Sequence, residues 1–238
     1  SLTPAKITEP MGKGVELSRL QGIYLPSPNN MAEFEFIDML FNFIWLEQSS
    51  DHLLIKSLQN ADRQLLQINE SLFRDVHRTQ ASHVVYSNEE SRVFISDGLK
   101  TFQKASGITL VLYWVSLIFG LIGLTYIFLI GLIRIFKRDK DGLRRIKWVF
   151  INLALFSLPI YLYANQSFLK FGDITAASIC LAFLSGLLPI TLLFSLWISL
   201  RGKLQSKLIK LDIASFMMSI QFCLVLAAWG QIPIIFWQ

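Results

Sequence analysis

The chain has 238 residues, of which 53% are hydrophobic and 16% are charged, and its formal net charge is +5. Residues 1–105 hold 10 basic and 13 acidic residues, so the remaining 12 basic and 4 acidic residues give residues 106–238 a net charge of +8. Because these basic residues flank long apolar runs and form no basic groove with aromatics, the composition excludes a nucleic-acid-binding protein. The two cysteines, Cys180 and Cys223, both fall inside apolar runs, so we expect them to be packing residues.

The first hundred residues contain short apolar runs separated by turn residues. Residues 1–16 mix Pro, Thr, Lys and Gly without periodicity and are predicted to be a linker. Residues 17–104 carry short strand-like runs at spacings of about 8–12 residues, which is typical of an antiparallel meander. This segment is predicted to form a small antiparallel β-barrel or half-barrel outside the cytoplasm. A helix is also possible at the start of residues 31–47.

Two groups of side chains in this segment are candidates for a site. The first is an aromatic cluster that either lines a ligand pocket or, as we favour, fills the barrel core or faces a neighbouring domain or the membrane surface, namely Phe34, Phe36, Phe41, Phe43 and Trp45. The second comprises the three histidines, His52, His77 and His83. Their separations are wider than zinc sites use, so no metal or other cofactor is predicted. Ligand-binding residues are left open.

Four long runs without a charged residue fill the second half of the chain. They are 29, 22, 27 and 26 residues long and cover Ala105–Ile133, Trp148–Leu169, Ile174–Leu200 and Ile213–Gln238. Each exceeds the roughly 20 apolar residues that a helix needs to cross a bilayer. Residues 105–238 are therefore predicted to be a four-helix transmembrane domain, with spans at about 106–133, 148–167, 174–199 and 212–236. The fold class is an α+β membrane protein, and the lipid bilayer is its first partner.

The polar residues within these runs indicate packing rather than transport. No ionisable residue lies inside any run, which argues against an ion-coupled transporter. Small residues are expected to let helices approach closely, namely Gly120, Gly123, Ala182 and Gly186. Asn152, Gln221 and Gln231 are expected to form hydrogen bonds between helices.

The basic residues also predict the orientation of the chain. Loops 134–147 and 200–211 are rich in Lys and Arg, which are retained in the cytoplasm. Residues 1–104 and the C-terminus are then outside the cytoplasmic (plasma) membrane. Residues 1–30 contain no basic stretch followed by an apolar region, as an export signal would. We therefore expect the chain to be the C-terminal part of a longer exported polypeptide.

Three short motifs carry a family resemblance. They are the Gly22-Ile-Tyr24 opening within Leu20–Ser27, the Phe-Arg-Asp step within Glu70–Asp75, and the Phe-x-x-Asp-Gly hairpin within Arg92–Leu99. In this order, with membrane spans following, the chain resembles the region after the catalytic domain in serine β-lactamase-like, penicillin-binding-protein-related hydrolases. The resemblance implies a lipocalin-like β module and an upstream catalytic domain of the same polypeptide. It also implies substrates such as β-lactam-like amides, peptidoglycan-related peptides or small esters.

The chain itself carries no complete catalytic motif of that family. One S-x-x-K sequence occurs, Ser167 to Lys170, but no Y-x-N or K/H-x-G sequence lies in a suitable partner element. A nucleophile without a base and oxyanion donors is not a site, so Lys170 is expected to be an interfacial anchor. We therefore predict no catalytic residue in this chain and a non-catalytic, membrane-anchoring role at the cell envelope. The alternative is a stand-alone membrane receptor or accessory protein whose β module binds a lipid, peptide or protein partner. The oligomeric state is not predicted.

Overall fold

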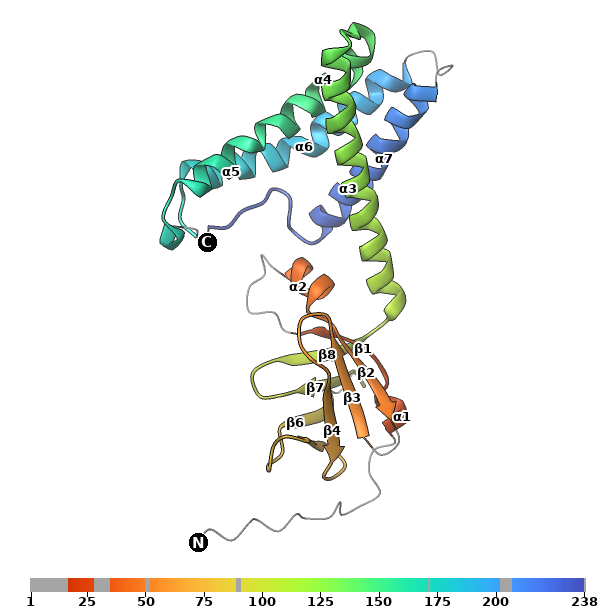
Figure 1. The fold of residues 1–238 in the computed structure, drawn as a ribbon, viewed down its shortest axis with the longest axis vertical. Helices are drawn as coiled ribbons and strands as arrows, with labels where there is room; N and C mark the ends of the chain where they lie inside the picture. Colours follow the sequence, from red (N-terminus) through yellow and green to blue (C-terminus); the bar gives the residue numbers. More distant parts are fainter. Residues whose placement is uncertain are drawn as a thin grey trace. The chain divides into compact units, whose positions relative to one another are not determined.

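The computed structural model describes residues 17–27, 35–49, 52–88, 91–170, 172–201 and 207–237. The chain divides into two compact units, Ser1–Val111 and Leu112–Gln238 (Figure 1). The first unit contains the β-strands and two short helices, and the second contains most of the long helices.

The first unit is a closed antiparallel barrel in which each strand pairs with its neighbours in sequence (Figure 1). Its eight strands are β1 (Gly22–Pro26), β2 (Ile44–Ser49), β3 (His52–Ser57), β4 (Arg63–Gln67), β5 (Leu72–Asp75), β6 (His83–Ser87), β7 (Val93–Ser96) and β8 (Thr101–Ala105). The barrel closes where β1 pairs with β8, from Ile23 opposite Ala105 to Pro26 opposite Phe102. The predicted barrel is therefore confirmed, in its closed form.

One end of the barrel is filled by apolar side chains. Alternate residues of each strand point inward, and Tyr24, Leu46 and Phe73 have no exposed surface. Helix α1 (Leu17–Leu20) precedes β1 and buries Leu20, whose carbonyl oxygen accepts a hydrogen bond of 2.9 Å from the Tyr24 hydroxyl. Burial raises the pKa of Tyr24 to about 12, so this donor stays protonated.

Helix α2 (Glu35–Phe41) lies at the opposite end of the barrel, because it connects the end of β1 to the start of β2 (Figure 1). The helix buries Phe36, Met39 and Leu40, the last of which is only 1% exposed. This helix falls within residues 31–47, where the sequence allows one. It leaves part of this end of the barrel open.

The second unit consists of helices that are long and apolar enough to cross a membrane. They are α3 (Gly107–Phe136), α4 (Lys140–Leu155) with α5 (Ser157–Ala164), α6 (Ala176–Leu200) and α7 (Lys207–Ala228), and a short 3-10 turn, η2 (Phe168–Lys170), precedes α6. Counting α4 and α5 as one, these are four candidate spans. The protein is therefore an integral membrane protein.

The helix bounds differ from the charge-free runs at both ends of α7, at the end of α3 and at the start of α4. Helices α4 and α7 begin in the flanking basic segments, where long Lys and Arg side chains can extend toward water, and α3 continues to Phe136 and takes in the buried Arg134. Helix α7 ends at Ala228 rather than near residue 236, because Gly230 has a φ of 69° and Pro233 follows it.

Glycines bring α3 and α7 into close contact. A Cβ atom on Gly120 would lie 2.3 Å from Phe222 Cγ, and one on Gly123 would lie 2.7 Å from the carbonyl oxygen of Ser215. Only glycine fits at either position, which confirms the predicted close approach.

The interhelical hydrogen bonds predicted for Asn152 and Gln221 are also present. The Gln221 amide nitrogen donates to the Ser116 carbonyl oxygen at 3.0 Å, and the Ser116 hydroxyl donates to the Gln221 amide oxygen at 2.9 Å. Asn152 donates from α4 to the Leu184 carbonyl oxygen of α6 at 3.3 Å.

A buried ion pair joins α3 and α7 near the C-terminal end of α3. Arg134 Nη2 donates to both carboxylate oxygens of Asp212, at 3.1 and 2.9 Å, and Arg134 Nη1 donates to the Gly142 carbonyl oxygen at 3.1 Å. The Tyr126 hydroxyl donates to the same carboxylate at 3.2 Å. Arg134 is 3% exposed and Asp212 has no exposed surface.

This ion pair corrects the predicted bounds of one loop, while the charge-free runs contain neither residue. Arg134 is the first residue of the predicted loop 134–147 and Asp212 the first residue of the span predicted at 212–236, yet both lie within helices and are buried. They are tolerated because each charge meets an opposite charge with several hydrogen bonds. Two of the four candidate spans therefore contain a buried ionisable residue.

Removing one partner of this pair should destabilise the helical unit. Arg134→Met leaves the Asp212 carboxylate buried without its counter-ion, which costs about 3–5 kcal/mol. We expect a lower midpoint of thermal denaturation in detergent. The midpoint is measured as the temperature at which half of the protein is no longer monodisperse. The double variant Arg134→Met/Asp212→Leu should recover most of the loss, and Lys137→Met, at an exposed position nearby, should have no effect. A wild-type midpoint for Arg134→Met alone would show that the pair is not structural.

Candidate functional site

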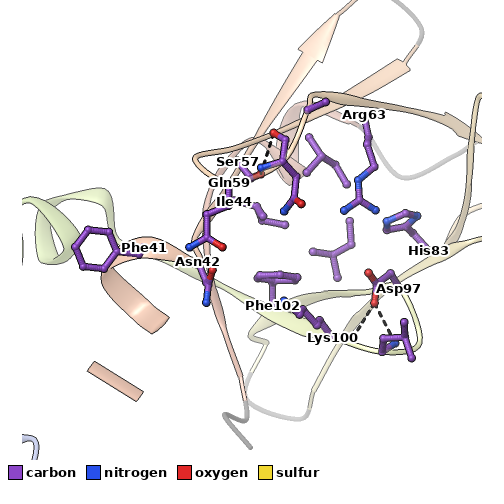
Figure 2. Close-up of a pocket in the computed structure, with 15 residues that line it drawn as sticks. Phe41, Asn42, Ile44, Ser57, Gln59, Arg63, His83, Asp97, Lys100 and Phe102 are labelled. Carbon is purple, nitrogen blue, oxygen red and sulfur yellow. Dashed lines mark hydrogen bonds between the residues drawn. The ribbon is translucent and has the colours of Figure 1, made fainter. Parts of the chain in front are cut away.

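The open end of the barrel contains a pocket of ≈ 180 Å³ (Figure 2). Its walls come from α2 and the residue after it, the β3–β4 turn, the β7–β8 turn and the inward faces of the strands between them. The lining residues are Phe41, Asn42, Ile44, Ile55, Ser57, Gln59, Asn60, Ala61, Arg63, His83, Ile95, Asp97, Leu99, Lys100 and Phe102.

Three charged or titratable residues reach this pocket because they lie at strand ends on inward-facing positions. Arg63 is the first residue of β4, His83 is the first residue of β6, and Asp97 directly follows β7. Each is two residues away from a buried apolar residue of the same strand, so it points to the same face of the sheet. Figure 2 shows the Arg63 guanidinium and the His83 ring facing each other, with Asp97 beside them.

The His83 ring is held in place and is neutral near pH 7. It is 7% exposed, and its Nδ1 atom lies 2.9 Å from the Ser82 hydroxyl, which accepts a hydrogen bond of 2.8 Å from the Asp75 amide. Desolvation lowers the pKa of His83, and the positive charge of Arg63 lowers it further, against the opposing effect of Asp97.

The carboxylate of Asp97 is fixed by its own turn. Its Oδ1 atom accepts hydrogen bonds from the amides of Lys100 and Leu99, at 2.7 and 3.0 Å. Burial raises the pKa of Asp97, but these two hydrogen bonds outweigh burial, so its pKa lies below the ordinary value. Gly98, with a φ of 85°, allows the turn.

Apolar side chains surround the Arg63 guanidinium in the pocket wall. Ile44, Ile55, Ile95 and Phe102 provide hydrocarbon surface around the polar groups. Within the described ranges the half-buried Arg63 guanidinium forms no hydrogen bond or ion pair. The pocket thus combines an apolar wall with a cation that has no ion-pair or hydrogen-bond partner among the described residues.

Of the described members of the predicted aromatic cluster, Phe41 alone lines the pocket. Phe36 is 3% exposed, and Trp45 is 52% exposed on the outer face of β2. Phe43 is half-buried, and Phe34 lies outside the described residues. The buried Phe36 packs in the interior, and Trp45 belongs to the barrel surface.

The histidines and the S-x-x-K sequence lie in separate places. His52 faces outward on β3 and His77 is exposed in the β5–β6 loop, so only His83 belongs to the pocket. Ser167 and Lys170 are both exposed around η2, where the Lys170 amide donates to the Ser167 carbonyl oxygen at 3.0 Å. Cys180 and Cys223 are free thiols, half-buried and buried. The part of the chain that the structure describes contains no group of three His, Cys, Asp or Glu residues placed to hold a metal.

The geometry around His83 favours binding over catalysis. Ser82 and His83 form a hydrogen-bonded pair, but the serine oxygen also accepts from the Asp75 amide. In a catalytic triad a carboxylate accepts a hydrogen bond from the second ring nitrogen of the histidine. Among the described residues no carboxylate is hydrogen-bonded to that nitrogen of His83. Ser82 thus orients the ring. No family model, curated protein or solved structure matches this chain.

The burial of His83 predicts its titration. Because desolvation lowers its pKa in the folded state, the His83 ring should titrate at a lower pH in the folded protein than in the unfolded chain. The unfolded chain takes up this proton first, so the barrel should lose stability as the pH falls below about 6.5 toward the folded pKa. The NMR ring signal of His83 can be assigned by its absence in His83→Gln and followed through a pH titration. Titration of this signal at the same pH in the folded protein and in the urea-unfolded chain would contradict the burial of His83.

Proposed function

We propose that the chain is the membrane-anchoring and β module of a serine β-lactamase-like hydrolase that acts at the cell envelope. In this proposal the catalytic domain belongs to the same polypeptide, upstream of residue 1, and residues 1–238 are themselves non-catalytic. The observation that carries the proposal is the closed eight-stranded barrel followed by four candidate spans. This combination is what the family resemblance of the three short motifs implies.

The motifs support the proposal because each one contributes to the barrel. The Gly22-Ile-Tyr24 motif forms β1, where Gly22 has a φ of 139° and Tyr24 is fully buried. Phe73 on β5 is also fully buried, and Asp97-Gly98 forms the turn at the pocket mouth. Residues that recur in a family for structural reasons are expected at such positions.

The anchoring role rests on the helical unit. The ion pair of Arg134 and Asp212, together with the glycine contacts of α3 with α7, stabilises the helical bundle. We place the barrel on the outer side of the plasma membrane because the segments between α3 and α4 and between α6 and α7 are the basic ones. A hydrolase attached to this module would be held within reach of envelope substrates.

The orientation can be tested with single cysteines. In a Cys180→Ala/Cys223→Ala background, Gln80→Cys is exposed in the barrel and Lys137→Cys is exposed after α3. In intact cells a membrane-impermeant maleimide should label Gln80→Cys only, and after lysis it should label both. Labelling of Lys137→Cys in intact cells would invert the proposed topology.

The hydrolase origin can be tested by sequence and by activity. The reading frame upstream of Ser1 should encode S-x-x-K, Y-x-N and K/H-x-G sequences, whereas an export signal directly before Ser1 would favour the receptor or accessory alternative. Purified residues 1–238 should not hydrolyse a chromogenic β-lactam or a p-nitrophenyl ester. Hydrolysis by this chain that disappears in Ser167→Ala would contradict its non-catalytic role.

A further inference from the structure

The pocket of the barrel contains a cation whose hydrogen-bond donors are open to the pocket. The Arg63 guanidinium is half-buried at the pocket wall, and among the described residues it forms no ion pair or hydrogen bond. Its donors are therefore available to an anion that enters the pocket. Guanidinium groups bind carboxylates with two parallel hydrogen bonds.

Asp97 does not supply that anion. One of its oxygens already accepts two amide hydrogen bonds within the β7–β8 turn, and no ion pair with Arg63 forms within 4.0 Å. Its charge is thus stabilised by its own turn. Asp97 instead limits the pocket to one anionic group, because a second negative charge would lie against it.

His83 offers a second donor beside Arg63. Its ring is neutral, and where Nδ1 accepts from the Ser82 hydroxyl, Nε2 carries the proton. Among the described residues no protein acceptor meets this second ring nitrogen. A neutral donor and a cation on facing walls suit the two oxygens of a single carboxylate.

The rest of the pocket determines what accompanies the carboxylate. Ile44, Ile55 and Phe102 form apolar walls, and the filled core below them closes the barrel interior. The volume of ≈ 180 Å³ is well below that of sites for drug-sized ligands. It has room for about six water-sized groups.

We propose that this pocket binds a small monocarboxylate, with its carboxylate on Arg63 and His83 and its short hydrocarbon chain against Ile44, Ile55 and Phe102. The inference rests on the barrel alone and does not depend on the proposed hydrolase origin. It assigns the barrel a ligand of its own rather than only a structural role.

The test uses the full chain in nanodiscs of zwitterionic lipid, with butanoate as the probe. Butanoate should bind saturably and shift the ring signals of His83, whereas butan-1-ol and butylammonium, which keep the hydrocarbon but lack the carboxylate, should bind at least about tenfold more weakly. Equal binding of butanoate and butan-1-ol, or no saturable binding of butanoate, would overturn the proposal without any variant.

Matched variants then assign the contact. Arg63→Gln should weaken butanoate binding by about tenfold or more, which corresponds to the loss of a charge-assisted hydrogen bond. Arg78→Gln removes an exposed arginine of the β5–β6 loop that does not line the pocket, and it should leave binding unchanged. Should Arg63→Gln bind butanoate as the wild type does while His83 keeps its signal, the carboxylate site is not at Arg63.

Discussion

Both halves of this chain are shaped by the need to pair every backbone N–H and C=O group internally. In the first unit the pairing of β1 with β8 removes the two free sheet edges that an open meander would expose. In the second unit helices meet the same requirement, which a bilayer enforces because it offers no water to unpaired groups. Closure also gives the sheet an interior face and an exterior face. Because side chains alternate between these faces along each strand, every second residue is buried in the barrel interior.

Closure explains why the two ends of the barrel differ. At the α1 end, Leu20 and Tyr24 complete an apolar core, and the one buried hydroxyl is satisfied by a backbone carbonyl. At the α2 end, Arg63 and His83 begin strands and Asp97 directly follows one. Polar residues at a strand end can remain partly hydrated while their neighbours are buried. The alternation that places apolar side chains in the core therefore also places these polar side chains at the open end of the barrel.

The sequence was sufficient for the architecture but not for the site. Apolar runs and turn residues predicted the barrel, and the charge-free runs predicted the four spans, because both signals are local. Arg63, His83 and Asp97 are separated by turns and strands whose register sets the facing direction, so their convergence depends on strand pairing that no local pattern reports.

The buried ion pair was missed for a related reason. Arg134 stands among six other basic residues of the segment that ends at Lys147, and Asp212 lies one residue before an apolar run, so both look like ordinary loop charges. Only the extension of α3 and α7 past their apolar runs brings the two together across 78 positions of sequence. A long-range electrostatic contact of this kind leaves no periodic signal in either helix.

That sequence separation has a consequence for biosynthesis. The ribosome completes α3 long before it reaches α7, so Arg134 has only the Asp139 carboxylate, 3.8 Å from its Nε atom, as an anionic partner while α4, α5 and α6 are made. The hydrogen bonds of Arg134 to both oxygens of Asp212 can form only once α7 is in place. A chain truncated before α7 therefore lacks the carboxylate that accompanies the burial of this guanidinium.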